Sequence, residues 1–514
     1  MSEAVARPLY SRDDLDELKE LPRAEVFEVL GSFDAEGLDE DECILRTADL
    51  LDAGRVPGLA AAGGAGDADA VADAAFAACR DCGEEAPAWS TMPDALEAAE
   101  DVMAHRFTFY EETHELPEDI DWDFNPGTRH WSHDLNRFWY LRPLVGAWRQ
   151  TGEERFARKG AALILDWVAK NDVADAFAGT DYAFGSYLNN AIHCEAWTWF
   201  LRRVLPAGIV EGRELMRVLK SLHDQMAYLE IVTNGHSGNW PTIGCRGILA
   251  TLVAMPVFRD TDRFADYCVG TMVEQVEDQV LPDGVQDELT PGYHGVVIRN
   301  LISAIRSTRA LGRELPPPML ETLHRMIHYG QQANLPGGIG MAAFNDSDPG
   351  RAADYGPVLE ELGLEEFLSP PEKLGPELFP WAGVAFLRQR ADEGDLYLAF
   401  DGGPFGRGHQ HEDKLGFVLS AYGRAFLVDP GRHRYDHSEI SYYDHLVTTR
   451  AHSTIRVDGR DQHSRAHPDL FIAKEPMPVA WSVADGEVRA AASYELGYGE
   501  ENDVEAVHRR EIVF

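Results

Sequence analysis

Lysine is scarce in this sequence, with seven residues among 514, whereas aspartate and glutamate together number 87. The formal net charge of −41 repels nucleic acid and anionic membranes, so neither is expected as a partner. An acidic surface of this kind is typical of salt adaptation, in which high ionic strength screens the repulsion between carboxylates. We therefore expect a halophilic source; the alternative is an ordinary acidic protein.

This charge leads to a prediction about salt. The melting temperature should rise as KCl is raised from dilute to molar concentration, because screening relieves the repulsion among surface carboxylates. Thermal unfolding followed across that range measures it. A melting temperature that stays flat or falls contradicts the prediction.

Long apolar runs are also missing. No stretch of about 20 apolar residues occurs, so no transmembrane segment is expected. The first 19 residues are acidic and polar and lack the basic and apolar parts of a secretory signal. We expect a cytoplasmic protein. A cell-envelope or secreted protein whose signal has been removed is the alternative.

Cysteine is sparse, with six residues in the chain. Cys79 and Cys82 form a single CxxC pair, and a zinc ribbon needs four ligands. We expect free thiols, which suit a reducing compartment.

The length predicts more than one domain. Residues 1–91 read as an acidic, partly helical region, within which the Ala/Gly/Asp-rich stretch 60–69 is expected to be a loop. Residues 92–370 show helical spacing, and an (α/α) toroid of helical hairpins is expected there. Helices are expected near 186–204, 213–231, 246–257, 262–280, 293–311 and 317–334.

From about residue 381 the apolar period changes to two. Strands are expected at 382–388, 395–400, 417–420, 425–428 and 454–457, so residues 371–514 read as an antiparallel β-sandwich domain. The chain stops within an apparent strand at 510–514, and we expect the natural protein to continue. The fold class is therefore α+β and multidomain.

The segment Gly406-Arg-Gly-His-Gln-His-Glu-Asp413 carries the strongest chemical pattern. On a strand, His409, His411 and Asp413 would share one face. Asp429 and His452 follow at later strand ends, and two imidazoles with a carboxylate suit zinc. The alternative is a set of hydrogen-bonded surface histidines.

Three further motifs offer polar side chains. Tyr293 follows an Asp-Gly turn at the start of a helix, where the helix dipole favours a phenolate; the alternative is a tyrosine packed under the helix end. The loop Thr233-Asn-Gly-His-Ser-Gly-Asn-Trp240 can hydrogen-bond a carboxylate or simply cap a helix. Asn190 and His193 line either a cleft or a packed core.

These motifs together resemble the heparinase II/III-like polysaccharide lyases, a group that includes related alginate lyases. The resemblance covers about residues 105–514. The best match is residues 381–463, with the blocks Gly383-Val-Ala-Phe-Leu-Arg388, Asp401-Gly-Gly-Pro-Phe-Gly406, His409-Gln-His-Glu-Asp-Lys-Leu-Gly-Phe417, Leu427-Val-Asp-Pro-Gly431, Arg450-Ala-His-Ser-Thr454 and Val457-Asp-Gly459 in a specific order and spacing. The helical half also looks alike in Glu288-Leu-Thr-Pro-Gly-Tyr-His294.

The resemblance implies the fold and the site. Tyr293 and His409 would be the catalytic pair, and Asn239, with His236 second, would neutralise the substrate carboxylate. A structural Zn²⁺ would be held by His411, Asp429 and His452. Substrate binding is assigned to Asn234, Trp240, Asn190, His193 and Arg407, and the partner is an acidic, uronate-containing polysaccharide.

The implied reaction is β-elimination, in which a base removes the C5 proton of a uronate and an acid protonates the oxygen leaving C4. Two alternatives stay open. An α/α-toroid glycoside hydrolase would need two carboxylates, for which Asp283, Asp287 and Glu288 are candidates. A non-catalytic carbohydrate-binding envelope protein would keep the fold and lose Tyr293 or His409.

Overall fold

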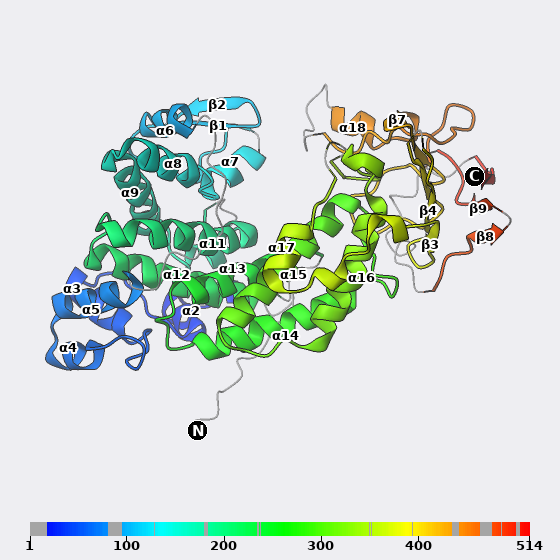
Figure 1. Ribbon diagram of the computed structural model, residues 1–514. Helices are drawn as coiled ribbons and strands as arrows, with labels where there is room; N and C mark the ends of the chain where they lie inside the picture. The colour runs from blue at the N-terminus through cyan, green and yellow to red at the C-terminus, as the bar shows by residue number, and fades with distance from the viewer. Residues whose placement is uncertain are drawn as a thin grey trace. The chain divides into compact units, whose positions relative to one another are not determined.

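The computed structural model describes residues 18–80, 95–127, 129–178, 183–233, 236, 238–348, 350, 352–392, 394–433, 442–462, 475–484, 486–499 and 504–514. The chain divides into two compact units (Figure 1). The first comprises Met1–Met272 with Ser307–Glu314, and the second comprises Val273–Arg306 with Leu315–Phe514. The predicted domain boundaries at 91 and 370 remain a prediction.

The described part of the first unit consists mainly of helices, with one hairpin of β1 (Arg106–Phe109) and β2 (Glu112–Glu115). Its helices are α2 (Arg23–Leu30), α3 (Glu40–Ala48), α4 (Leu59–Ala65), α5 (Ala68–Arg80), α6 (Ala95–Met103), α7 (Arg129–Asn136), α8 (Leu141–Thr151), α9 (Glu154–Lys170), α10 (Asp175–Ala178), α11 (Tyr187–Val204), η1 (Leu205–Ala207), α12 (Gly212–Val232) and α13 (Trp240–Ala254).

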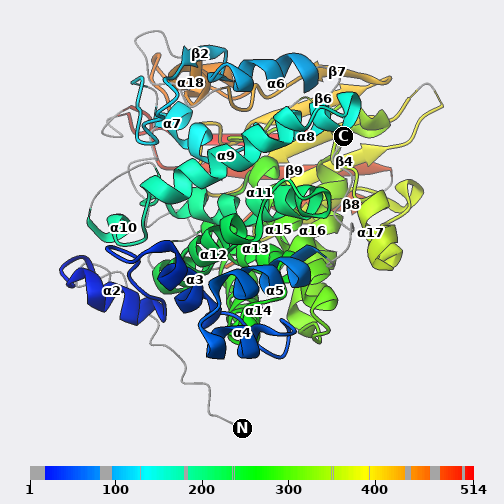
Figure 2. The same ribbon diagram turned by 90° about the vertical axis from the view of Figure 1, so that its left-hand side faces the viewer.

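Buried aromatic side chains hold these helices together. Trp131, Trp167 and Trp197 are fully buried, and the rings of Trp167 and Trp197 meet edge to face at 5.2 Å. α8 packs against α6 and α9, and α11 packs against α12 and α13 (Figure 2). Helices packed side by side in this way are what the helical apolar spacing of the sequence predicts.

The second unit combines helices with two antiparallel sheets. α14 (Thr261–Gln279) and α15 (Pro291–Ala310) contribute residues to both units. α16 (Pro317–Ala333), η3 (Pro336–Gly338), α17 (Gly356–Leu362), η4 (Glu365–Phe367), η5 (Pro371–Lys373), α18 (Tyr442–Leu446) and η6 (Thr449–Ala451) belong to the second unit alone.

The larger sheet has the strand order β3-β4-β5-β6-β7, and the smaller has the order β10-β9-β8. Their bounds are β3 (Glu377–Phe379), β4 (Val384–Gln389), β5 (Leu396–Asp401), β6 (Phe417–Ala421), β7 (Arg424–Leu427), β8 (Ala480–Ala484), β9 (Glu487–Tyr494) and β10 (His508–Val513).

The period of two in β4 places alternate side chains on opposite faces of the larger sheet. Val384 and Phe386 pack with Tyr329 of α16 and with Val285, which lies between α14 and α15. Ala385 and Leu387 pack instead against the smaller sheet, in a core that includes Val488, Ala490 and Tyr494. The two sheets therefore share one core, as in a β-sandwich.

The expected helices between 186 and 334 and the four strands between 382 and 428 are confirmed. Residues 60–69 are not a loop, because α4 and α5 occupy most of them and the chain turns at Gly66, whose φ is 68°. Residues 454–457 are not a strand and contribute only an isolated bridge between Val457 and Arg460. Within the described residues, no helix is long and apolar enough to cross a membrane.

Candidate active site

Tyr293 is the third residue of α15, so its expected place at a helix N-terminus is confirmed. Its backbone N–H donates to Thr290 Oγ1 at 3.0 Å. The half-buried side chain therefore lies near the positive end of the helix dipole, which favours negative charge on a phenol oxygen.

His409 lies in the loop between β5 and β6, and its ring stacks on that of Tyr293. The ring centroids are 3.8 Å apart and the planes differ by 17°. The Nδ1 atom of His409 lies 2.5 Å from the buried carboxylate of Glu288. A carboxylate accepts a hydrogen bond from Nδ1–H, so the neutral ring carries its lone pair on Nε2.

The segment 406–413 is not a strand, which corrects the expectation that His409, His411 and Asp413 share one face. The backbone turns at Gly408 and His409, whose φ angles of 72° and 55° lie in the left-handed region. His409 consequently turns toward Glu288, whereas His411 is directed to Asp346. The turn separates the two histidines into different environments.

Three distant segments are tied together around His409. The Arg407 N–H donates to the carbonyl oxygen of Asp287, and the His411 N–H donates to Asn345 Oδ1, both at 2.9 Å. The Asn345 amide donates in turn to the carbonyl oxygen of Leu289 at 3.0 Å. The loop is thus anchored on both sides of His409, to Asp287 through Arg407 and to Asn345 through His411.

His411, Asp429 and His452 form a group that could hold a metal ion, since their ligand atoms all lie within 4.8 Å of one another. All three side chains are buried. Nδ1 of His411 is buried without a hydrogen-bond partner among the described residues, whereas its Nε2 pairs with Asp346 Oδ1 at 2.8 Å. A carboxylate on the far nitrogen of an imidazole is the usual arrangement around a metal-bound histidine. His409 is not part of this group.

Arg407 lies beside the same loop, and its Nε atom is 3.0 Å from Asp287 Oδ2. Its Nη1 atom is 3.2 Å from the exposed carboxylate of Asp278. The guanidinium is thus partly exposed and paired with two carboxylates.

The carboxyl group of Asp287 should make stability depend on pH. Burial raises its pKa to about 7, with a smaller contribution from Glu288 and against the effect of Arg407. The folded protein then keeps a proton that the unfolded chain has released. The free energy of unfolding should therefore fall, on the order of a few kcal/mol, as pH rises from about 4 to about 7.

Asp287→Asn cannot lose a proton and tests this directly. The melting temperature of the variant relative to the wild type should increase between about pH 5 and about pH 8, because only the wild type comes to bury a charged carboxylate. A difference that is the same at both pH values would show that Asp287 does not titrate in this range.

In the first unit, His236 packs against two aromatic rings. Its centroid is 4.3 Å from that of Tyr187 and 4.9 Å from that of Trp240. Asn239 is buried at the N-cap of α13, yet its side chain makes no capping hydrogen bond. The capping alternative thus does not account for Asn239. Asn234 lies outside the described residues.

Asn190 and His193 are fully buried in α11. His193 pairs with Gln225 Oε1 at 3.0 Å and with the carbonyl oxygen of Asn136, and burial lowers its pKa to about 4. The Asn190 amide donates to the carbonyl oxygens of Phe184 and Ser186. The packed-core alternative describes both residues, and their assignment to substrate binding receives no support from the structure.

Comparison with known proteins decides the family. Residues 88–361 match the family model for the heparinase II/III N-terminus, and residues 372–514 match the one for the heparinase II/III-like C-terminal domain. The chain belongs to the heparinase II/III family.

Curated relatives carry the name heparin-sulfate lyase. The protein of Pedobacter heparinus is 24% identical over 403 residues, covering 71% of this chain and 58% of that protein. The protein of Bacteroides stercoris is 22% identical over 269 residues, covering 47% of this chain and 40% of that protein. The chain therefore matches less than two thirds of the length of these relatives.

Solved structures agree in fold. A crystal structure of heparinase III has a TM-score of 0.75 at 16% identity and covers 91% of this chain and 77% of that one. The heparan sulfate lyase HepC of Pedobacter heparinus has a TM-score of 0.62 at 20% identity, covering 91% and 76%. These likenesses confirm the predicted fold class, a helical toroid followed by an antiparallel β-sandwich.

Two residues of the candidate site make contacts that the sequence motifs do not predict. Glu288 was a candidate only for hydrolase chemistry, although it stands in the same block as Tyr293. No motif includes Asp346, although Asn345-Asp-Ser-Asp348 is a run of short polar residues directly after the apolar stretch 341–344. A run of short polar residues directly after a buried stretch is the sequence signal that indicates a contact of this kind.

Proposed function

We propose that the chain is a polysaccharide lyase that cleaves uronate-containing chains by β-elimination. The observation that carries the proposal is the stacked pair of Tyr293 and His409, with Glu288 on the Nδ1 atom of His409. The names of the curated relatives make a heparan-sulfate-type glycosaminoglycan the first substrate to test.

The pair supplies both proton transfers that elimination requires. In the neutral His409 ring, hydrogen-bonded to Glu288 through Nδ1, the Nε2 lone pair can accept the C5 proton. The Tyr293 hydroxyl can donate to the leaving oxygen on C4. For sugars whose eliminated groups are syn, Tyr293 as phenolate can perform both steps, and its place at the start of α15 favours that charge.

The substrate carboxylate must be neutralised before its α proton becomes acidic enough to remove. We assign this to the Asn239 amide, with His236 second, because a hydrogen bond to the carboxylate stabilises the developing enediolate. Arg407 is assigned to binding substrate anions. Trp240, which is 39% exposed, offers a ring face for a sugar.

Zinc is the metal we propose for His411, Asp429 and His452. The two imidazoles and the carboxylate would supply nitrogen and oxygen ligands that suit zinc, and binding of the ion would stabilise the loops that carry these residues. His409 lies outside this ligand group, so we assign the two histidines separate roles, His411 in metal binding and His409 in proton transfer.

The three carboxylates that a hydrolase mechanism would use are each paired with other groups of the protein. Glu288 pairs with His409, and Asp287 pairs with Arg407. Asp283 accepts backbone N–H groups of Trp381 and Ala382 at 2.7 and 3.0 Å. Inverting and retaining hydrolases both need two carboxyl groups directed at the glycosidic bond, so this arrangement favours elimination.

The function is tested by product chemistry. Elimination leaves a carbon–carbon double bond conjugated with the uronate carboxylate, whereas hydrolysis leaves none. Incubation with heparan sulfate, heparin, unsulfated glucuronate polymers and alginate should give new ultraviolet absorbance with at least one polymer. Reducing ends that appear without this absorbance would refute the lyase proposal.

Glu288→Gln should lower kcat by about 10²-fold while leaving KM nearly unchanged, because the carboxylate holds His409 in its reactive tautomer. Glu377→Gln is the matched control, since Glu377 pairs with His328 at 2.7 Å outside the site. Comparable kcat values in the two variants would remove Glu288 from the mechanism. A flattened pH–rate profile in Glu288→Gln alone distinguishes positioning of His409 from a general loss of stability.

A further inference from the structure

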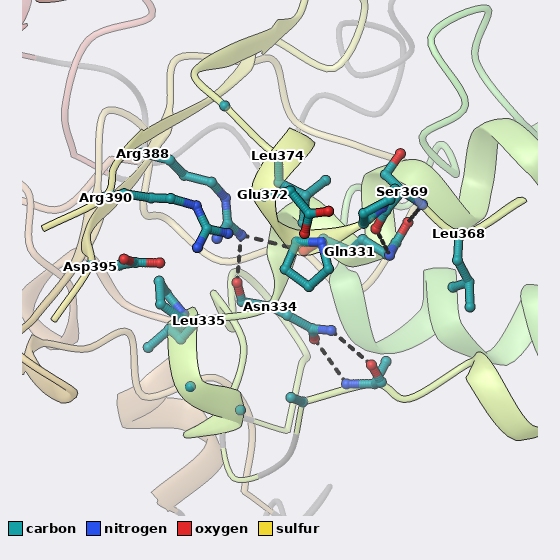
Figure 3. Close-up of a pocket in the computed structure, with 18 of the residues that line it drawn as sticks. Gln331, Asn334, Leu335, Leu368, Ser369, Glu372, Leu374, Arg388, Arg390 and Asp395 are labelled. Atoms are coloured by element: carbon teal, nitrogen blue, oxygen red, sulfur yellow. Dashed lines mark hydrogen bonds between the residues drawn. The ribbon is translucent and has the colours of Figure 1, made fainter. Parts of the chain in front are cut away.

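The second unit holds a cavity of about 890 Å³ that the proposed chemistry does not use. Arg390 and Asp395 line it at one end of the β4–β5 pair (Figure 3). Gln389 pairs with Leu396 at this end, whereas Val384 pairs with Asp401 at the other, from which the loop carrying His409 begins. Five residue steps along β4 separate the two ends by roughly 17 Å.

The cavity walls are held in place by two side-chain amides. Gln331 accepts from the backbone N–H of Ser369 at 2.9 Å and donates to its carbonyl oxygen at 3.0 Å. Asn334 forms the same reciprocal pair with Ala353, at 2.9 and 2.7 Å. Both loops that border the cavity are thus fixed to the end of α16, so the space is formed before any ligand arrives.

Two guanidinium groups lie on one side of this cavity (Figure 3). Arg388 is rigidly placed, because it donates to Gln332 Oε1 at 2.8 Å and to the carbonyl oxygens of Gln332 and Asn334 at 2.6 Å each. Arg390 is exposed and makes no hydrogen bond or ion pair with any described residue. Burial lowers the pKa of Arg388 against the effects of Tyr397 and Asp395, and the charge of Arg390 makes a smaller contribution in the same direction as burial.

The lining also limits how much negative charge can enter. Asp354, Glu372 and Asp395 all border the cavity. Sulfate groups spread along a saccharide would meet these carboxylates. One carboxylate directed at the guanidinium side, with hydroxyl groups toward the acids and the backbone, would match the lining.

We propose that this cavity is an accessory binding site for a short, unsulfated saccharide that carries one or few uronate carboxylates, with Arg390 as the carboxylate receptor. The ligand class rests on the proposed function. The site would hold a weakly charged stretch of the polysaccharide, or a released product, apart from Tyr293 and His409.

The test measures binding without turnover. Tyr293→Phe is used as the parent and titrated calorimetrically with an unsulfated glucuronate–N-acetylglucosamine tetrasaccharide, its sulfated counterpart and a neutral tetrasaccharide. We expect two sites for the unsulfated uronate probe. Adding Arg390→Ala should weaken one of them by about 10- to 100-fold, as loss of a charge-assisted hydrogen bond implies. The affinity of this site in the Arg390→Lys protein should lie between its affinities in the parent and in the Arg390→Ala protein.

Arg424→Ala is the matched control, because Arg424 is an exposed arginine of β7 that does not line the cavity. Equal affinities in the Arg390→Ala and Arg424→Ala proteins would overturn the proposal. A single site, no binding of the uronate probe, or tighter Arg390-dependent binding of the sulfated probe would overturn it as well. If Arg390-dependent binding is found while no polymer yields an unsaturated product, the lyase proposal fails and the accessory site stands.

Discussion

Tyr293→Phe and His409→Ala are each expected to lose about 10²- to 10⁴-fold in eliminative turnover, the usual contribution of a positioned acid or base. Phe keeps the ring that stacks on His409 at 3.8 Å and removes only the hydroxyl group. The fold and the affinity for substrate should therefore persist. Initial rates of double-bond formation, with binding measured separately, check both expectations.

His294→Ala is a poor control for this experiment, because His294 is buried and pairs with the carbonyl oxygen of Met326 at 2.9 Å. His328→Ala is better suited, since His328 is partly exposed and lies outside the site. Near-normal turnover in Tyr293→Phe or His409→Ala, on a substrate that the wild type degrades, would end the assignment of this pair.

The second large effect concerns the metal. His411→Ala should lose bound zinc, whereas His409→Ala should retain it, because the ligand group contains His411, Asp429 and His452 and excludes His409. Structural zinc sites contribute roughly 10 kcal/mol or more to folding at neutral pH in small domains. Metal analysis of the purified variants, together with melting temperatures before and after chelation, measures both consequences.

The opposite pattern would reverse the roles. If His409→Ala loses the zinc and His411→Ala keeps it, His409 is a ligand and Tyr293 must act without it. A wild-type protein that binds no zinc and melts at the same temperature with and without chelator would show that the three residues form only a hydrogen-bonded group, the alternative that the sequence left open.

The regular elements could be predicted because their signals are local. The apolar spacing of α11 to α16 and the alternation of β4 and β5 depend on neighbouring residues. The helix α4 was missed because its glycines suggest a loop, whereas tertiary packing holds Leu59 in the core.

The sequence motifs single out Tyr293 and His409 as a candidate pair, and the structure stacks their rings, but the shape of the loop that carries His409 could not be predicted. The alternation of His409, His411 and Asp413 is typical of a strand, and nothing local reveals the left-handed backbone of His409. The contacts of Glu288 with His409, and of Asn345 with His411, join residues 121 and 66 positions apart. Pairings over such distances depend on the whole unit, and the sequence motifs alone do not specify them.

The tying of three distant segments around His409 also has a kinetic consequence. Each closure fixes a long stretch of chain, and contacts of large sequence separation form late in folding. The stacked pair therefore exists only after the helical segment from Val273, the loop at Asn345 and the β5–β6 connection have all reached their native arrangement. Recovery of catalytic activity during refolding should therefore lag behind recovery of the helical circular dichroism signal. The time course of activity then reports when these three segments have come together.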